Sequence, residues 1–214
     1  MVHPLAVMLD EAAHGRFPEP DGTVHVLPSL TGSLDALVSF TGTFALAGAV
    51  SQSEVDARVP RGEFSVPMSS GFVSWLSERL GARAATHDAV LVAISSGDGS
   101  ADLVEADDLS DHPRVQRALR YRRDVRAYAT TDGRGIVVLG RGITGRWEIA
   151  FEVDEAARGT GLGRALAAAG VGLLPAGTPV WAQVAPGNAA SLRAVVAAGF
   201  RPVGSEILFV RDGG

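Results

Sequence analysis

The chain has 214 residues with a net charge of −5, and 46% of them are hydrophobic. This length can bury a full core in one ordinary domain or two small ones, and the acidic balance argues against nucleic acid as a partner. The chain has no cysteine, which excludes disulfides, thiol nucleophiles and thiolate metal sites.

Neither a membrane span nor a metal site is expected. No apolar run approaches the roughly 18 residues of a membrane helix, and the first residues lack the basic region of a signal peptide. We therefore predict a cytoplasmic protein with no membrane partner. The five histidines lack the spacing of metal ligands, and they stand at His3, His14, His25, His87 and His112.

Residues 1–100 are predicted to form an N-terminal α/β region. In chain order, the patterns indicate a leader helix or loose arm over 1–20, strands over 23–28 and 35–40, a helix over 69–80 and a buried strand over 87–94. Phe72 and Leu76 have the spacing of a helix, and Gly81 is expected to end it. No motif here indicates chemistry, so the region is left open as an acceptor-side wall, a degenerate repeat or a homodimer surface.

The polar, acidic stretch over 95–113 is the predicted linker, which divides the chain into 1–100 and 101–214. The second half is predicted to contain a helix over 113–121 capped by Ser110 or Asp111, strands over 124–131, 135–142 and 146–153, a helix ending at Leu174, a strand over 179–184, a helix over 189–198 and one or two strands over 200–210. Asp132-Gly133 is a hairpin signal, and the strand, helix, strand order implies a parallel crossover. The predicted fold class is α/β (α+β), with a mixed, mostly antiparallel twisted sheet.

The segment from Arg158 to Gly163, RGTGLG, lies between a predicted strand and a predicted helix. Backbone N–H groups at a helix N-terminus bind phosphate, and glycines let the ligand approach them closely. The spacing excludes the G-x-G-x-x-G loop of dinucleotide-binding proteins, and a chain without lysine has no P-loop. The alternative is that these glycines only make a strand-to-helix turn.

These residues match R-x-x-G-x-G, the pyrophosphate loop of the GNAT acetyltransferases. FEVDEAARGTGLGRAL resembles that family's strand, loop and helix for acetyl-coenzyme A (acetyl-CoA), and NAASLRAVVAAGF resembles its later N-x-x-S/A helix, which ends in Gly-Phe. The two motifs stand in the family's order. The resemblance covers about residues 105–214 and implies a GNAT-like fold there.

The resemblance implies that this half binds acetyl-CoA. In the family, the loop amides hold the pyrophosphate, and the strands beside the helix, here 147–153 and 180–184, splay apart to take the pantetheine. Backbone groups of one strand pair with the pantetheine amides, and a strand N–H polarises the thioester carbonyl. The implied coenzyme-binding residues are Phe151, Val153, Arg158, Gly159, Thr160, Gly161, Leu162, Gly163, Arg164 and Asn188.

Transfer of an acetyl group to an amine requires a neutral nitrogen, so a carboxylate near the site is expected to take a proton. The resemblance implies Glu148, five residues before Val153, as the first candidate for this base. Glu152 is the second, because strand alternation puts it on the same face. The alternative for both is an ordinary strand glutamate facing solvent.

The general acid is not identified by the sequence. Many relatives carry a tyrosine seven residues after the helix-opening asparagine, but Val195 stands at that distance from Asn188, and Tyr121 and Tyr128 do not match either. A water, or no acid, is equally compatible with the sequence. Asn188 also stands at an N-cap position, and capping explains it as well as a coenzyme contact does.

Six arginines crowd one short segment, at Arg114, Arg117, Arg120, Arg122, Arg123 and Arg126. They could attract an acidic acceptor or a nucleic acid. The acidic residues directly upstream favour instead a self-paired, solvated surface.

The sequence therefore predicts an N-acetyltransferase that moves the acetyl group from acetyl-CoA directly to a primary amine of a small molecule or a protein, without a metal. The alternative is a non-catalytic module that binds or senses acyl-CoA, because the usual tyrosine is missing.

Overall fold

A computed structural model describes residues 1–30, 32–99 and 102–211. The chain divides into two compact units, Met1–Val90 with Val203–Gly214 and Leu91–Pro202. Both contain helices and strands, so the predicted mixed α/β class is confirmed. Among the helices of the described residues, none combines the length and the apolar character that a membrane crossing requires.

The first unit is built on strands that hydrogen-bond in the order β1-β3-β2-β10-β4. Their bounds are β1 Val24–Leu27, β2 Leu34–Phe40, β3 Thr43–Ala47, β4 Arg83–Ile94 and β10 Arg201–Val210, and its helices are α1 Pro4–Ala13, α2 Gln52–Asp56 and α3 Ser70–Leu80. β1 runs parallel to β3, whereas β2 is antiparallel to β3 and to β10. The strand from the end of the chain thus belongs to the sheet of this unit.

The helix α3 forms where its apolar spacing predicts it. Ser69 is the N-cap, because its side chain accepts a hydrogen bond from the N–H of Phe72, and Gly81 ends the helix with a left-handed φ of 60°. Phe72 and Leu76 pack with apolar residues of β2, β3 and β10 in one buried cluster. This cluster is the core of the first unit on that side of the sheet.

The second unit contains the predicted antiparallel meander. Its strands are β5 Leu103–Glu105, β6 Arg123–Thr130, β7 Gly135–Arg141, β8 Trp147–Val153 and β9 Pro179–Val184, and its helices are α4 Pro113–Tyr121, α5 Leu162–Gly172 and α6 Ala189–Ala197. β5 to β8 pair antiparallel in chain order, and β9 pairs parallel to β8 after the α5 crossover. The predicted parallel pair is confirmed.

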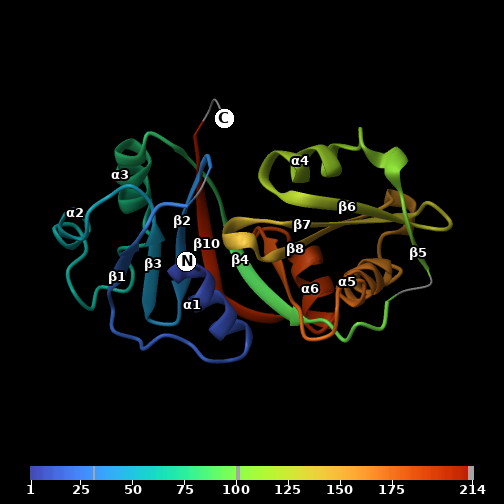
Figure 1. The fold of residues 1–214 in the computed structure, drawn as a ribbon, viewed down its shortest axis with the longest axis horizontal. Coiled ribbons are helices and arrows are strands. Elements are labelled where there is room, and N and C mark those ends of the chain that lie inside the picture. The colour runs from blue at the N-terminus through green and yellow to red at the C-terminus, as the bar shows by residue number, and fades with distance from the viewer. Residues whose placement is uncertain (31, 100–101, 212–214) are drawn as a thin grey trace. The chain divides into compact units, whose positions relative to one another are not determined.

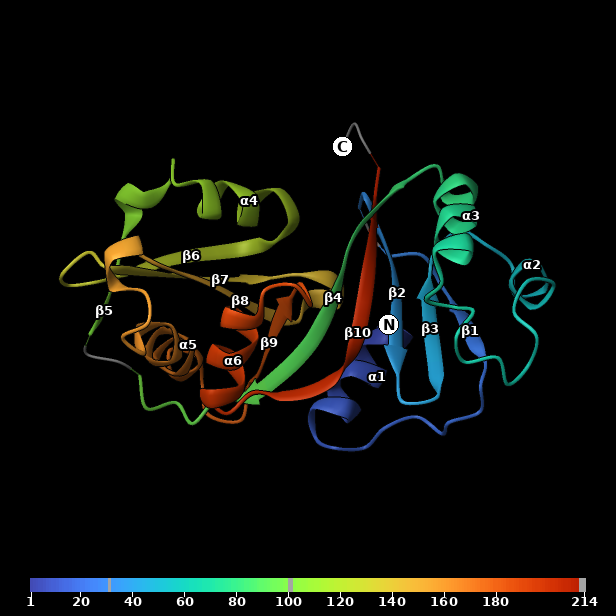
Figure 2. The same cartoon turned by 180° about the vertical axis from the view of Figure 1, so that it is seen from behind.

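The helices of the second unit cover both faces of its strands. Figure 1 shows α4 on one side of β6 and β7, with α5 and α6 on the other, and Figure 2 shows the same arrangement from behind. A Cβ built at Gly170 of α5 would lie 2.7 Å from the side chain of Ile149. Because side chains alternate along a strand, the odd-numbered side chains of β8 face α5 and the even-numbered ones, including Glu148, face α4.

Two elements of the first unit were missed by the sequence patterns. β3 is a short run of five buried residues, and α2 is a five-residue helix opened by a capping box at Ser51. Both are too short for a period to stand out.

The structure corrects the predicted cap of α4 and decides the number of strands at the end of the second half. The N-cap of α4 is His112, whose Nδ1 accepts from the N–H of Arg114 at 3.2 Å, and not Ser110 or Asp111. Pro113 occupies the first helical position, which makes the residue just before it the cap. The last segment forms one strand rather than two. The predicted linker contains β5, and its residues 100 and 101 lie outside the described residues.

Candidate functional site

The helix α5 begins without a side-chain cap. In each of the other five α-helices of the described residues a side chain accepts a hydrogen bond from a first-turn N–H, and these caps are His3, Ser51, Ser69, His112 and Asn188. The N-cap of α5 is Gly161, which has no side chain to do so. Because the first turn of a helix has no intrahelical acceptors, α5 leaves these N–H groups to solvent or to a ligand.

Six consecutive amide N–H groups, from Gly159 to Arg164, have no acceptor within the described part of the chain. The first bonded N–H belongs to Ala165 and donates to the carbonyl oxygen of Gly161 at 3.2 Å. Gly159, Thr160 and Gly161 are exposed. N–H groups without acceptors at the positive end of a helix dipole are an arrangement that binds phosphate.

Backbone conformation requires two of the loop glycines. Gly159 has a φ of 79° and Gly161 a φ of 90°, values that residues with a Cβ rarely adopt. A Cβ at either position would meet nothing within 4 Å. The requirement for glycine thus comes from the turn, and the space beside the amides stays open to a ligand.

An open pocket of about 530 Å³ lies at this end of α5. It is lined by Arg134, by two alanines of α5 and by four of the predicted coenzyme-binding residues, Thr160, Gly161, Leu162 and Arg164. Arg134 comes from the β6–β7 turn and Arg164 from α5, so arginines of two different elements line the pocket. The sequence motif gave no signal for Arg134, because it lies outside the loop and reaches it only through the fold.

Arg134 is held by an acidic neighbour. Its Nε lies 2.6 Å from a carboxylate oxygen of Asp132, and both side chains are largely exposed. Hydrogen bonds from Thr130 and Arg134 lower the pKa of Asp132 to about 2. This pairing orients Arg134 at the pocket without burying it.

Two other predicted loop residues make contacts within the loop. The Arg158 guanidinium is exposed and lies 3.9 Å from Glu155, which is a loose contact. The hydroxyl of Thr160 donates to the carbonyl oxygen of Ala157 at 2.8 Å. Thr160 therefore offers a ligand its main chain rather than its hydroxyl.

β8 and β9 separate after two residue pairs. The parallel register joins Trp147 with Val180 and Glu148 with Trp181, and it includes no later pair, although all residues of both strands are described. We call the space between the later parts of β8 and β9 the strand gap.

The backbone of β8 directs polar groups into the strand gap. The N–H of Asp154 donates to the carbonyl oxygen of Arg134 at 2.8 Å. This bond flanks the register pair Gly135–Val153, which is therefore a non-hydrogen-bonded pair of the antiparallel ladder. Alternation along β8 then turns the N–H and C=O of Val153 and Phe151 away from β7 and toward the strand gap.

The helix N-terminus and the strand gap are contiguous. A Cβ built at Gly163 would lie 3.5 Å from the side chain of Phe151 and 3.7 Å from that of Val153. Gly163 also belongs to the row of unbonded amides. One ligand can therefore contact the α5 amides and the edge of β8 together.

Glu148, the first candidate base, lies in a buried ion cluster. The Nε of Arg146 donates to Oε1 and the Nε of Arg122 to Oε2, each at 2.9 Å. Glu148 is 5% exposed, and a Cβ at position 142 would collide with its carboxylate, so Gly142 provides the space. Arg146 also lies over the ring of Trp181, 5.4 Å from its centroid.

The arginines determine the charge state of Glu148. Burial raises its pKa, but the charges of Arg146 and Arg122, with hydrogen bonds from Arg146 and Gln183, outweigh burial and hold the pKa below its ordinary value. The carboxylate is therefore ionised with both oxygens engaged, which makes it a weak proton acceptor. Its position is that of the last paired β8 residue before the strand gap.

Glu152, the second candidate base, is exposed. It forms one ion pair, with the Nε of Arg114 on α4 at 2.9 Å. Glu148 and Glu152 thus face α4 together, and both receive arginines from the basic run. The sequence favoured a surface on which these arginines pair with the acidic residues directly upstream. Arg114 and Arg122 pair instead with glutamates of β8.

Asn188 and Val195 have structural roles in α6. The Oδ1 of Asn188 accepts from the N–H of Ser191 at 3.1 Å and caps the helix. Val195, which stands at the position where the resemblance implies a tyrosine, is fully buried. No hydroxyl can therefore come from that position.

No protein-family model and no curated protein matches the chain. Solved structures that match include a GCN5-related N-acetyltransferase from Kribbella flavida, with 17% identity and a TM-score of 0.44 over 66% of this chain and 64% of that chain. A tandem GNAT protein from the clavulanic acid biosynthesis pathway matches with 16% identity and a TM-score of 0.40 over 68% and 59%. A functionally unknown conserved protein from Staphylococcus epidermidis matches with 14% identity and a TM-score of 0.44 over 80% and 85%.

The matched segment spans less than two thirds of the Kribbella chain and of the tandem GNAT protein. At these identities and TM-scores, what this chain does has to follow from its own residues.

Proposed function

We propose that the second unit binds acetyl-CoA and transfers its acetyl group to a primary amine. The observation that carries the proposal is the continuous row of unpartnered main-chain groups, from the amides of 159–164 to Phe151 and Val153 in the strand gap. The residues match the R-x-x-G-x-G sequence of the GNAT pyrophosphate loop, and they lie between the strand β8 and the helix α5.

The two parts of this row fit two parts of one ligand. Amide N–H groups at a helix N-terminus suit a diphosphate, and Arg134 and Arg164 add positive charge at its pocket. The open edge of β8 suits an extended chain of amides, which can hydrogen-bond to it like an added strand. Coenzyme A esters combine both features, because a diphosphate is joined to a pantetheine.

The residues of this chain would bind and orient the reactants. When bound, acetyl-CoA supplies a thioester on which the amine replaces the thiol while one proton passes from amine to thiol, a leaving group with a pKa near 8.5. With the diphosphate at the α5 loop, the acyl end points along β8 toward Trp147. A main-chain N–H facing the strand gap is then available to stabilise negative charge on the acyl oxygen.

Neither glutamate takes the proton of the amine in this proposal. Glu148 is a positioning residue, because its carboxylate holds Arg122 and Arg146 at the start of the strand gap. Glu152 is exposed and has a single partner, but it lies next to Val153 at the diphosphate end of β8 with its side chain facing α4. We therefore propose that water takes the proton from the amine.

Calorimetry with acetyl-CoA, followed by thiol release with a panel of primary amines, tests the proposal. We expect saturable binding and turnover, with Glu152→Gln keeping a kcat close to that of the wild type, because this carboxylate lies at the diphosphate end of β8. Absence of coenzyme binding by the wild-type protein would refute the proposal. A loss of kcat in Glu152→Gln that shrinks as the pH rises toward the pKa of the amine would instead assign Glu152 as the proton acceptor.

A non-catalytic acyl-CoA-binding module is the second candidate function. Two observations favour it: both oxygens of Glu148 are engaged by arginines, and Val195 is buried where a tyrosine acid is expected. Such a module would bind acetyl-CoA in calorimetry but release no thiol with any amine. Turnover with any amine excludes it.

A further inference from the structure

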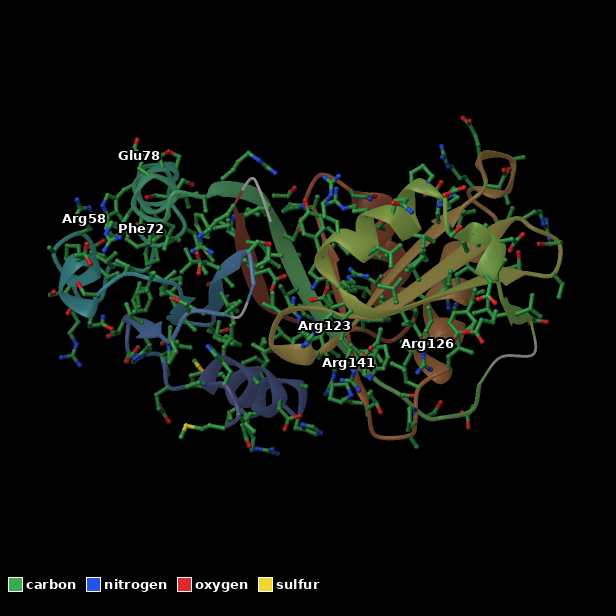
Figure 3. All side chains as sticks on the ribbon, turned by 45° about the horizontal axis from the view of Figure 1, so that its top comes forward. Arg58, Phe72, Glu78, Arg123, Arg126 and Arg141 are labelled. Carbon is green, nitrogen blue, oxygen red and sulfur yellow. The ribbon has the colours of Figure 1, made fainter. Side chains whose placement is uncertain are left out.

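Three arginines gather on the α5 face of the sheet near Trp147, and we call Arg123, Arg126 and Arg141 the arginine patch. The guanidinium carbons of Arg141 and Arg126 lie 4.4 and 5.6 Å from the centroid of the Trp147 ring. Arg123 is the register partner of Arg141 on the neighbouring strand, and Figure 3 shows these two next to each other. Positive charge is therefore concentrated at the start of β8.

The patch depends on a β-bulge in β6. The register pairs Arg123 with Arg141 and then shifts before Arg126, so that three residues along β6 match two along β7. Side chains three apart in a regular strand face opposite sides, and the extra residue brings Arg126 to the face of Arg123. Asp124, inside the bulge, has a φ of 50°, which is unfavourable for a residue other than glycine.

Little negative charge balances the patch. Within the described part of the chain, its one ion pair joins Arg141 to the exposed Asp124 at 3.4 Å. Arg123 and Arg126 are exposed and have no acidic partner among the same residues. Like charges on directly opposite strand residues repel each other. A bound anion would relieve this repulsion, so the patch favours anionic ligands.

The patch lies at the end of β8 to which the acyl group would point. A coenzyme held by the α5 loop runs along β8 from Val153 past Phe151 toward Trp147, the first residue of the strand. Phe151 and Trp147 are four residues apart, which is roughly 13 Å along a strand. A small molecule that carries an amine and a second functional group can span a distance of this order.

We propose that the amine acceptor carries an anionic group, a carboxylate or a phosphate, and that the arginine patch binds it. The inference rests on the proposed function, since it names the substrate class of the same site. Arginine suits this role because its planar fork donates two parallel N–H groups to one oxyanion. The ring of Trp147 holds two of the guanidinium groups in place.

Matched amines test the preference. Thiol release is measured with 4-aminobutyrate against butylamine and with phosphoethanolamine against ethanolamine, and 1,4-diaminobutane serves as a cationic probe. We expect kcat/KM for each anionic amine to exceed that of its neutral partner by about tenfold or more, the effect of one charge-assisted contact. Equal values across the panel, or a preference for the diamine, would overturn the proposal.

Two matched variants assign the preference to the patch. Arg126→Gln should lower kcat/KM for the anionic amines by about tenfold and leave the neutral amines unchanged. Arg117→Gln removes an exposed arginine of α4 and should change neither. Equal losses for anionic and neutral amines in Arg126→Gln would show a structural role and overturn the proposal.

Binding without coenzyme separates this inference from the proposed function. Titration with phosphoethanolamine or 4-aminobutyrate should shift the NMR signal of the Trp147 indole N–H in the wild type but not in Arg126→Gln. Coenzyme binding without such a shift and without an amine preference would refute the inference alone. A shift without any coenzyme binding would refute the proposed function and leave the patch as an anion site. If poly-glutamate shifts the Trp147 signal and neither small anion does, the arginine patch binds an acidic polypeptide rather than the amine acceptor, and the inference is overturned.

Discussion

The two ends of the strand gap differ in whether their polar groups have partners within the protein. Near Val153 and the α5 loop, main-chain groups lack partners within the described residues. Near Glu148, a carboxylate is buried with an arginine on each oxygen. The first end leaves main-chain groups open to solvent or to a ligand, and at the second end both oxygens of the carboxylate are engaged by the protein. Substitutions at the closed end should therefore change stability, and those at the open end should change binding.

The largest effect is expected at the closed end. Glu148→Gln removes the charge that balances Arg122 and Arg146, and breaking a buried ion pair costs about 3–5 kcal/mol. Urea unfolding followed by tryptophan fluorescence measures this loss. Glu152→Gln is the matched control, because it breaks an exposed pair worth less than about 1 kcal/mol. Equal losses in the two variants would contradict a difference between buried and exposed glutamates.

The same cluster predicts a dependence on acid. The folded-state pKa of Glu148 is lowered, so its ionisation stabilises the protein above the ordinary pKa of roughly 4.3 and this contribution is lost as the pH falls through the folded-state value. The stability difference between wild type and Glu148→Gln should be constant near pH 7 and shrink below about pH 4. A difference that stays constant down to pH 3 would contradict a lowered pKa.

At the open end, Gly161→Ala should weaken coenzyme binding more than folding. The residue has a φ of 90°, so a Cβ strains the loop by about 1–3 kcal/mol and stands beside the amides. We expect affinity for acetyl-CoA to fall by at least about tenfold in calorimetry.

Gly199→Ala is the control for this strain. Gly199 follows α6 with a φ of 95°, and a Cβ there would meet nothing within 4 Å. This variant should lose similar stability in thermal unfolding and keep its affinity. Equal affinity losses in both variants would mean that strain, and not the place of Gly161, affects binding.

The open end was predictable from sequence to a larger extent than the closed end. The α5 loop consists of contiguous residues. Its glycine spacing before an apolar helix indicates both the turn and the unbonded amides at the helix N-terminus. The partners of Glu148 come from two places, Arg146 nearby and Arg122 in the segment after α4, and only the α4 packing brings them together.

The arginine patch shows the same limit. Arg126 shares a face with Arg123 only because of a bulge, and strand alternation predicts the opposite. Local signals, such as caps and periodic apolar residues, identified α3, α4 and β9 to within a few residues. The strand β10 pairs with β2, which lies far from it in the sequence, and no local sequence pattern indicates this pairing.

The smallest effect is expected at Asn188, which separates capping from ligand contact. Asn188→Ala removes the hydrogen bond to the N–H of Ser191 and should cost about 1 kcal/mol in urea unfolding. Asn188→Asp keeps an acceptor at the same place and should restore this stability. Because the helix α6 already uses the Oδ1 of Asn188, we expect the affinity of both variants for acetyl-CoA to stay within about threefold of wild type. A different result would be an Asn188→Asp variant that is as stable as the wild type but binds acetyl-CoA at least about tenfold more weakly. This result would show that the side-chain amide of Asn188 contacts the coenzyme, and the open end of the site would then extend from α5 to α6.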